Sequence, residues 1–236
     1  MERTDLYIEL STDCNAAGSV TWECSGHHVT FSVYGPEEAK AQEELTHRAC
    51  VDVIVTPPIG QHTLRETELE VFLASVLERL IDVKEFPRTK ISGRLCIVSG
   101  DASHPRTVAA ALNAASLALL QSGLPLRATV TAVCVKIGTT LMAVAVDVTH
   151  PQLRGSQKET KDPSVFAVYT GHTGEVPVPG SAGFTPEEFL NALSLPGDFQ
   201  HFSPNSKSGD QGVLYKQALD IADAMVTQLA STMHVQ

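Results

Sequence analysis

The stretch Val98–Ile137 reads VSGDASHPRTVAAALNAASLALLQSGLPLRATVTAVCVKI, and it decides the fold. An apolar strand ends in the polar turn Asp101–Thr107, and an alanine-rich helix follows over 107–122. Gly123 and Pro125 are the stop signals of that helix. A long run rich in β-branched residues begins after this break. The order predicts a unit of strand, loop, helix and strand.

The rest of the chain is rich in strands. A helix is predicted over 64–83 from apolar residues at three- and four-residue spacing. Thr185-Pro186-Glu187-Glu188 is typical of a helix start, and an apolar stripe predicts a last helix over about 211–233. The polar segment Glu37–Thr46 is expected to be a loop or a bent extension of a strand. Strands are predicted over 6–10, 18–24, 27–34, 48–56, 90–98, 127–137, 140–148 and 164–170.

The domain organisation follows from this order. No low-complexity linker divides the 236 residues. Strands followed by a helix occur in the first half and again in the second, which predicts one compact unit of two similar β-rich halves with packed helices. About a dozen strands and about four helices indicate the α+β (mixed α/β) class. We therefore expect a single domain over residues 1–236.

Charge and hydropathy exclude several classes of protein. The chain has 17 Lys and Arg against 27 Asp and Glu, a formal net charge of −10. This balance does not favour broad contact with nucleic acid, because such affinity depends on clustered Lys and Arg. The start, MERTDLYIEL, lacks the pattern of a secretory signal, and no run approaches the ~18 apolar residues of a membrane span. An intracellular protein with no membrane partner is expected.

Metal and cofactor motifs are missing from the sequence. Five widely spaced cysteines argue against a disulfide framework or a zinc site, and we expect buried, reduced thiols. His27 and His28 are adjacent on a predicted strand, so their side chains point to opposite faces and cannot readily share one ion. There is no P-loop, dinucleotide fingerprint or G-x-S-x-G motif. No metal and no cofactor is therefore predicted.

Several short motifs occur in a characteristic order along the chain. Gly18-Ser19-Val20 and Val33-Tyr34-Gly35-Pro36 resemble the pair that opens RNase PH domains. Leu112-Asn113-Ala114-Ala115, followed by the break and Leu126-Arg127-Ala128, resembles ring subunits of the RNA exosome. Asp162-Pro163-Ser164-Val165 resembles a strand entry of the family, and segments within 175–188 resemble a later motif and its helix.

This resemblance covers most of the chain and implies an RNase PH-like fold, of the ribosomal protein S5 domain 2-like type. Members of the family degrade RNA with phosphate or serve as ring subunits of the RNA exosome. VYGPEEAK (33–40), LNAASLALLQSGLPLRA (112–128) and Pro87-Arg88-Thr89 are most similar to eukaryotic ring subunits that have lost phosphorolysis.

Phosphorolysis in the family needs cationic side chains that hold phosphate against the RNA 3′ end, since both reacting groups are anionic. The resemblance aligns Ala74 with the first of two arginines of active members, and Val108 with the second. Arg106 lies two residues early, in an expanded turn that lacks the family's double glycine. It remains a candidate phosphate or RNA ligand; the alternative is a solvated or interface arginine.

The acidic positions are also incomplete. Asp147 matches the first acidic position of the family and Asp162 a later structural one, whereas the acid expected six residues after Asp147 is absent. Glu159 is not required by the spacing. If the chain were active, Arg106 and Asp147 would act with a Mg²⁺ ion; otherwise Asp147 is a turn or cap residue. The degenerate site favours a chain with no catalytic residues.

RNA contact is predicted in one loop. In the family, the loop after the Gly-Pro motif points into the channel of the ring and touches the RNA backbone. Here it spans Glu37–Arg48, with Lys40, His47 and Arg48 as its cationic candidates. Four glutamates surround them, so a weak contact or a solvated surface is expected. Together with Arg106, these are the predicted RNA-binding residues.

The resemblance therefore implies a structural, RNA-guiding subunit of the RNA exosome ring in 3′→5′ RNA processing and degradation, itself without phosphorolytic activity. The implied partners are other RNase PH-like ring subunits, exosome cap proteins and single-stranded RNA, with a homodimer possible in isolation. The implied location is the nucleus, including the nucleolus, and the cytoplasm. One alternative is an active phosphate-dependent 3′→5′ exoribonuclease. Another is an unrelated α/β binding protein, favoured if Gly35-Pro36 and Asp101–Thr107 lie far apart.

Overall fold

Five strands from the N-terminal half form one sheet. The computed structural model describes residues 6–137, 140–147 and 165–170. The strand order is β1-β2-β3-β5-β4, and neighbours are antiparallel except β4 and β5, which are parallel. The strands are β1 (Leu6–Leu10), β2 (Gly18–Cys24), β3 (His27–Glu38), β4 (Cys50–Thr56) and β5 (Thr89–Ser99).

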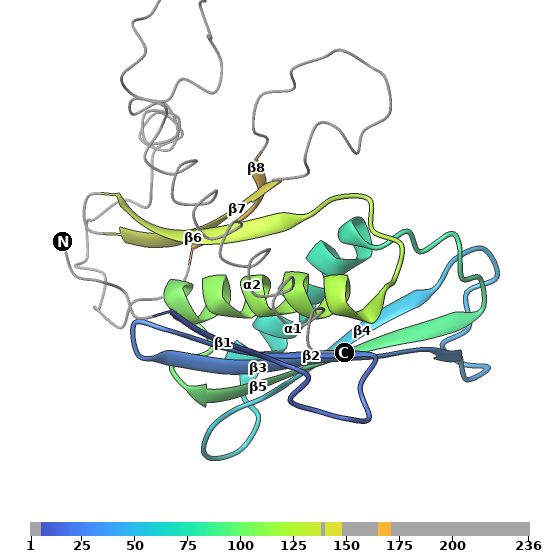
Figure 1. The fold of residues 1–236 in the computed structure, drawn as a ribbon, viewed down its shortest axis with the longest axis horizontal. Helices are drawn as coiled ribbons and strands as arrows, with labels where there is room; N and C mark the ends of the chain where they lie inside the picture. The colour runs from blue at the N-terminus through green and yellow to red at the C-terminus, as the bar shows by residue number, and fades with distance from the viewer. Residues whose placement is uncertain (1–5, 138–139, 148–164, 171–236) are drawn as a thin grey trace, which may run out of the picture.

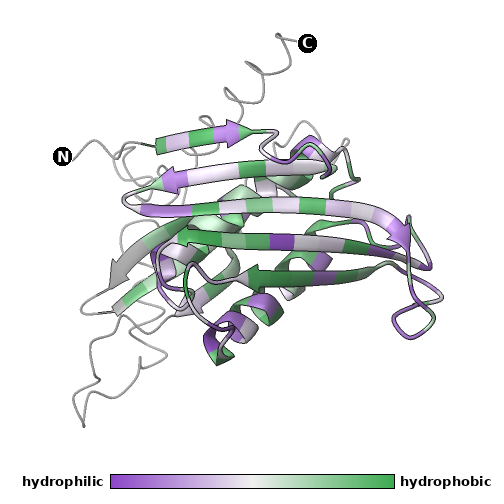
Figure 2. Ribbon diagram, turned by 90° about the horizontal axis from the view of Figure 1, so that it is seen from below, coloured by the Kyte–Doolittle hydropathy of each residue, from purple (hydrophilic) through white to green (hydrophobic). Residues whose placement is uncertain are grey.

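Alternation along these strands gives the sheet one apolar and one polar face. Trp22 and Phe31 turn inward and are at most 2% exposed. Thr21 and Thr30 face outward, where their hydroxyl oxygens lie 3.1 Å apart. Figure 2 shows this outer face in front, with the helices behind it. The strand β3 continues to Glu38 through an irregular register, so the polar segment begins as a bent extension.

Helix α1 (Leu64–Leu80) connects the parallel strands β4 and β5. It begins with a capping box between Thr63 and Glu66, in which each residue satisfies a backbone N–H of the other. The helix ends three residues before the predicted end, because Ile81 is extended and pairs with Leu126. Its buried apolar residues are Leu69, Leu73, Val76, Leu77 and Leu80.

Helix α2 (Pro105–Ser122) lies between the two sheets of the molecule (Figure 1). The sequence predicted one apolar stripe, whereas 14 of the 18 helix residues are buried. Alanine has the smallest side chain that still favours a helix, and six alanines let both sheets approach closely. Gly123 ends the helix as predicted, with a left-handed φ of 70°.

The first sheet comes very close to α2 at Gly18. A Cβ at this position would lie 2.2 Å from the carbonyl oxygen of Ala118, so a side chain there requires the helix to shift. The neighbouring Ser19 N–H donates to Oε1 of Gln121 at 3.0 Å. The Gly-Ser motif therefore fixes the start of β2 against α2.

Three further strands form a second, antiparallel sheet in the order β6-β7-β8. They are β6 (Val130–Ile137), β7 (Thr140–Asp147) and β8 (Val165–Thr170). The first of them starts later than predicted because Arg127 is held outside the sheet: its guanidinium lies 2.6 Å from Asp82. Asn113 of α2 accepts from the Ala132 N–H at 2.7 Å and donates to the Ala132 carbonyl at 2.9 Å. One buried amide thus ties β6 to the helix.

Two sheets around packed helices confirm the α+β (mixed α/β) class. The predicted helices at 185–188 and 211–233 lie outside the described residues, as do Asp162 and Glu159. The two similar halves and the single domain over 1–236 therefore stay predictions. No helix in the described ranges has the length and apolarity to cross a membrane.

The five cysteines are free thiols, but the prediction that they are buried is wrong. Cys14 is exposed and the other four are half-buried. Cys96 shows why: it lies across from Thr30 on the outer, polar face of the first sheet. Within the described ranges, no group of three or more histidine, cysteine or acidic side chains is arranged to hold a metal ion.

Candidate functional site

The Asp101 carboxylate stabilises the turn between β5 and α2, residues 101–104, through hydrogen bonds. One carboxylate oxygen accepts from the Ser103 N–H at 3.1 Å and from its hydroxyl at 3.2 Å. The other oxygen accepts from Nη1 of Arg65, at the start of α1, at 2.9 Å. The carboxylate therefore joins the turn to α1.

The backbone donors at the start of α2 are also engaged within the chain. The His104 N–H donates to the Asp101 carbonyl at 3.0 Å, and the Arg106 N–H donates to Nδ1 of His104 at 3.1 Å. Pro105, between them, has no N–H. A helix N-terminus binds an anion through free backbone N–H groups. Here the N–H groups of His104 and Arg106 already have acceptors within the turn.

Two histidines stack beside this turn. The ring centroids of His27 and His104 lie 4.8 Å apart, with 22° between the ring planes. Nδ1 of His27 lies 2.9 Å from the hydroxyl of Thr107. Burial lowers the pKa of both imidazoles, and the positive charge of Arg106 lowers each pKa further.

Arg106 is exposed at the second position of α2. Its guanidinium reaches the half-buried thiol of Cys134 on β6. Burial raises the pKa of that thiol, and Arg106 opposes the rise. Arg106 is thus a cation at the turn. The arginine of α1 that reaches the same turn, Arg65, is already paired with Asp101.

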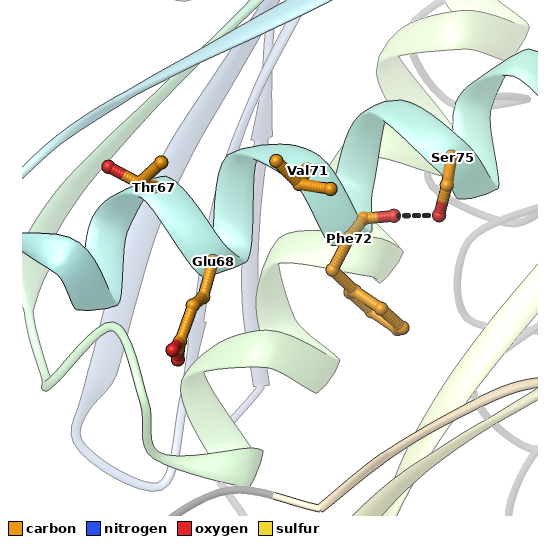
Figure 3. Close-up of a pocket in the computed structure, with 5 residues that line it drawn as sticks. All are labelled: Thr67, Glu68, Val71, Phe72 and Ser75. Carbon is orange, nitrogen blue, oxygen red and sulfur yellow. Dashed lines mark hydrogen bonds between the residues drawn. The ribbon is translucent and has the colours of Figure 1, made fainter.

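The outward side of α1 is apolar where the resemblance expects an arginine. Ala74 is half-buried against the core. Next to it, Val71 and Phe72 line an open groove of about 480 Å³ with Thr67, Glu68 and Ser75 (Figure 3). None of these described lining residues is an arginine.

The two arginines of α1 are engaged elsewhere. Arg65 pairs with Asp101, as described above. Arg79 donates to the carbonyl of Phe166 at 3.1 Å, and its guanidinium carbon lies 4.3 Å from the centroid of that ring. Both contacts tie α1 to neighbouring elements, so neither side chain stands in for an arginine at Ala74.

Arg106 and Asp147, the residues of the enzyme alternative, lie beside different positions of β6. Arg106 contacts Cys134, whereas Asp147 at the end of β7 pairs with Val130. Four residues of strand separate these two positions, roughly 13 Å. The structure does not bring the two side chains to one place.

The three cationic residues of the predicted RNA loop are exposed: Lys40, His47 and Arg48. Arg48 forms an ion pair with Glu78 of α1. Within the described part of the chain, Lys40 has no carboxylate within ion-pair distance.

Two of the surrounding glutamates have other partners. Nζ of Lys90 lies 2.9 Å from Glu43, and Nε of Arg88 lies 3.3 Å from Glu44. The glutamates near Lys40 are therefore partly neutralised by Arg88 and by Lys90 of β5. Lys40, unlike Arg48, keeps its charge without a carboxylate partner among the described residues.

The candidate RNA-binding residues fall into two separate groups. His27, at the start of β3, touches the turn that carries Arg106. Gly35-Pro36 lie near the other end of this strand, where the RNA loop begins. Eight residues of strand separate His27 from Gly35, roughly 26 Å. Gly35-Pro36 and Asp101–Thr107 are therefore far apart, the arrangement that would favour an unrelated binding protein.

The sequence itself resolves this point. A model of the 3′ exoribonuclease family, domain 1, known as RNase PH, matches residues 3–125, which is more than half of the chain. The chain belongs to the RNase PH family. Distance between the two motifs was the wrong criterion, because Gly35 serves its own strand: a Cβ there would lie 2.7 Å from the carbonyl oxygen of Lys90.

Relatives in the RNase PH family carry exosome names. The chain is 33% identical over 110 residues to the exosome complex component rrp46 of Schizosaccharomyces pombe, covering 47% of this chain and 48% of that protein. It is 31% identical over 117 residues to the exosome complex exonuclease RRP46 homolog of Arabidopsis thaliana, covering 50% and 48%. The matches span about half the length of these curated relatives.

A solved structure shares the fold. The crystal structure of rice (Oryza sativa) Rrp46 superposes with a TM-score of 0.67, covering 97% of this chain and 96% of that one at 19% identity. The predicted RNase PH-like fold is confirmed.

We did not predict from the sequence that His104 caps α2 or that His27 stacks on it at the Asp101–Thr107 turn. His104 precedes Pro105 at a helix start, which is the position of an N-cap, and this signal was available in the sequence. His27 gave no such signal, because only the fold brings β3 to the start of α2.

Proposed function

We propose that this chain is a structural, RNA-guiding subunit of an RNA exosome ring, acting in 3′→5′ RNA processing and degradation without phosphorolytic activity of its own. Membership of the RNase PH family and the exosome names of the relatives support the setting. In this proposal it assembles with other RNase PH-like subunits and cap proteins in nucleus, nucleolus and cytoplasm, and forms a homodimer when isolated.

The observation that carries the non-catalytic part is the state of the α2 turn. Three of its backbone N–H groups, those of Ser103, His104 and Arg106, are engaged by Asp101 and His104. Helix α1 presents Ala74 instead of an arginine. Phosphate and RNA both carry negative charge, so holding them together requires several free donors. Arg106 alone cannot provide the contact that two arginines make with phosphate. Asp147, at the end of β7, is too far from Arg106 to act with it.

The RNA-guiding part rests on exposed cations. Lys40 is the stronger candidate in its loop, since Arg48 already has Glu78 as a partner. His47 and Arg106 are the remaining proposed contacts. Because the chain carries a net charge of −10, the proposal assigns most of the phosphate contact to neighbouring chains.

The test of catalysis is incubation of the purified chain with single-stranded RNA and Mg²⁺, with and without inorganic phosphate. We expect neither nucleoside diphosphates nor shortened RNA. Diphosphates that form only with phosphate, and disappear in Arg106→Ala, would establish phosphorolysis and overturn the proposal.

The test of the ring role is co-expression with other RNase PH-like chains, followed by native mass spectrometry. A stoichiometric complex supports a ring subunit, and failure to join any such chain contradicts it. In that complex, Lys40→Ala is expected to weaken RNA binding and to reduce the slope of log affinity against log salt concentration by about one. Arg48→Ala is the matched comparison and is expected to change less.

A further inference from the structure

The cap of α2 is chemically unusual because its acceptor can take up a proton. N-cap acceptors are normally the side-chain oxygens of Ser, Thr, Asp or Asn, which stay acceptors at neutral pH. In this chain the acceptor is Nδ1 of His104, 3.1 Å from the Arg106 nitrogen. An imidazole nitrogen accepts a hydrogen bond only while it carries no proton. The cap therefore exists only in one protonation state of His104.

From this geometry we propose that His104, stacked on His27, is a pH-dependent cap that closes the Asp101–Thr107 turn when neutral and releases it when protonated. The inference concerns the turn itself and does not depend on the proposed exosome role. Release of the cap would affect more than the first turn of α2, because the same turn is bonded to α1 through Arg65 and contacts β3 through His27.

The surroundings of the pair favour the neutral, closed state. The stacked ring of His27 would place a second positive charge 4.8 Å from a protonated His104. There is little free space beside the pair, since a Cβ at Gly100 would lie 2.9 Å from Nδ1 of His27 and 2.7 Å from the Thr107 hydroxyl. Burial of the two rings and the neighbouring imidazole both oppose uptake of a proton.

The charged groups that face the pair come from three elements. Arg106 of α2 lowers the pKa of both histidines, after the effect of burial. Asp101 of the turn acts in the opposite direction on His104, but its charge is shared with Arg65 of α1. On β3, the neighbouring His28 projects to the other face of the sheet. The net effect is a pKa below the ordinary 6.5 for both histidines.

The sign of the pH effect follows. A base whose pKa is lower in the folded chain binds fewer protons there than in the open chain, so the closed turn loses stability as the pH falls below about 6.5. Above that value both forms are neutral and the cap is fully effective. Release at acid pH would also free the Arg106 N–H and leave three positive side chains close together.

The test is amide hydrogen exchange of the full-length chain, measured by NMR at pH 7.5 and pH 5.0 and expressed as protection relative to unstructured peptides. Protection of the Arg106 amide is expected to fall about fivefold at the lower pH, the factor that loss of one N-cap produces. His104→Asn keeps an acceptor that does not titrate, so its protection should stay the same at both values. His28→Gln is the matched histidine control and should behave as the unmodified chain.

Two results would overturn the proposal. One is equal protection of the Arg106 amide at both pH values in the unmodified chain, and the other is an equal fall in His104→Asn. The nitrogen chemical shifts of His104 give an independent readout: at pH 7.5 the proton must reside on Nε2, and a proton on Nδ1 contradicts the cap.

Discussion

Replacement of Asn113 by leucine tests how the second sheet is held to α2. The amide of Asn113 is 3% exposed and makes two hydrogen bonds to one residue, Ala132, which is 1% exposed. Leucine is similar in volume and keeps the helix, but it removes both bonds. Because β6 is at the edge of the described second sheet, no described strand on that side replaces them.

The magnitude follows from the two groups that lose their partners. A buried donor or acceptor left unsatisfied costs about 1–3 kcal/mol, so the Ala132 N–H and carbonyl together cost about 2–6 kcal/mol. The added apolar surface of leucine offsets about 1 kcal/mol. We expect Asn113→Leu to lower the free energy of unfolding by about 3 kcal/mol.

The assay is urea denaturation followed by circular dichroism, with hydrogen exchange of the Ala132 amide as a local readout. Asn15→Leu is the matched control, because Asn15 is exposed, and it should change stability by less than about 0.5 kcal/mol. A loss below about 1 kcal/mol in Asn113→Leu, or an Ala132 amide as protected as before, would refute the reasoning.

Three further predictions follow from named contacts. Gly18→Ala should destabilise the chain by about 3 kcal/mol in urea denaturation, because the new Cβ would meet the backbone of α2. The control Gly26→Ala, in open space at a positive φ, should cost about 1 kcal/mol, and equal losses in the two variants would contradict the close approach of Gly18 to α2. Glu66 is partly desolvated, but its hydrogen bonds with the α1 cap keep its pKa below 4.5, so the free energy of unfolding should fall as the pH drops below 4.5. Glu66→Gln should flatten that part of the curve of stability against pH, and an unchanged curve would argue against this role. Arg48→Ala should change thermal stability by less than about 0.5 kcal/mol, since its ion pair with Glu78 is half exposed, and a larger loss in a double-mutant cycle would show a stronger bond.

Much of the described fold was predictable from local pattern. Alternation and turn residues placed the strands within a few residues of their observed ends, and Gly123 marked the end of α2. These signals are local, because strand and helix periods are properties of neighbouring residues. The early end of α1 was not predictable, since it depends on Ile81 pairing with Leu126, far along the chain.

Some features of the candidate site were likewise visible in the sequence, and others only in the structure. The sequence alone determined that Ala74 has no guanidinium and that the turn lacks its glycine pair, because missing functional groups are visible in composition. Only the tertiary structure decided that Arg106 and Asp147 are separated along β6, that His27 stacks on His104, and that Arg48 is paired with Glu78. Each of these facts is a distance between segments remote in sequence, and such distances are set by how the sheets close around α2.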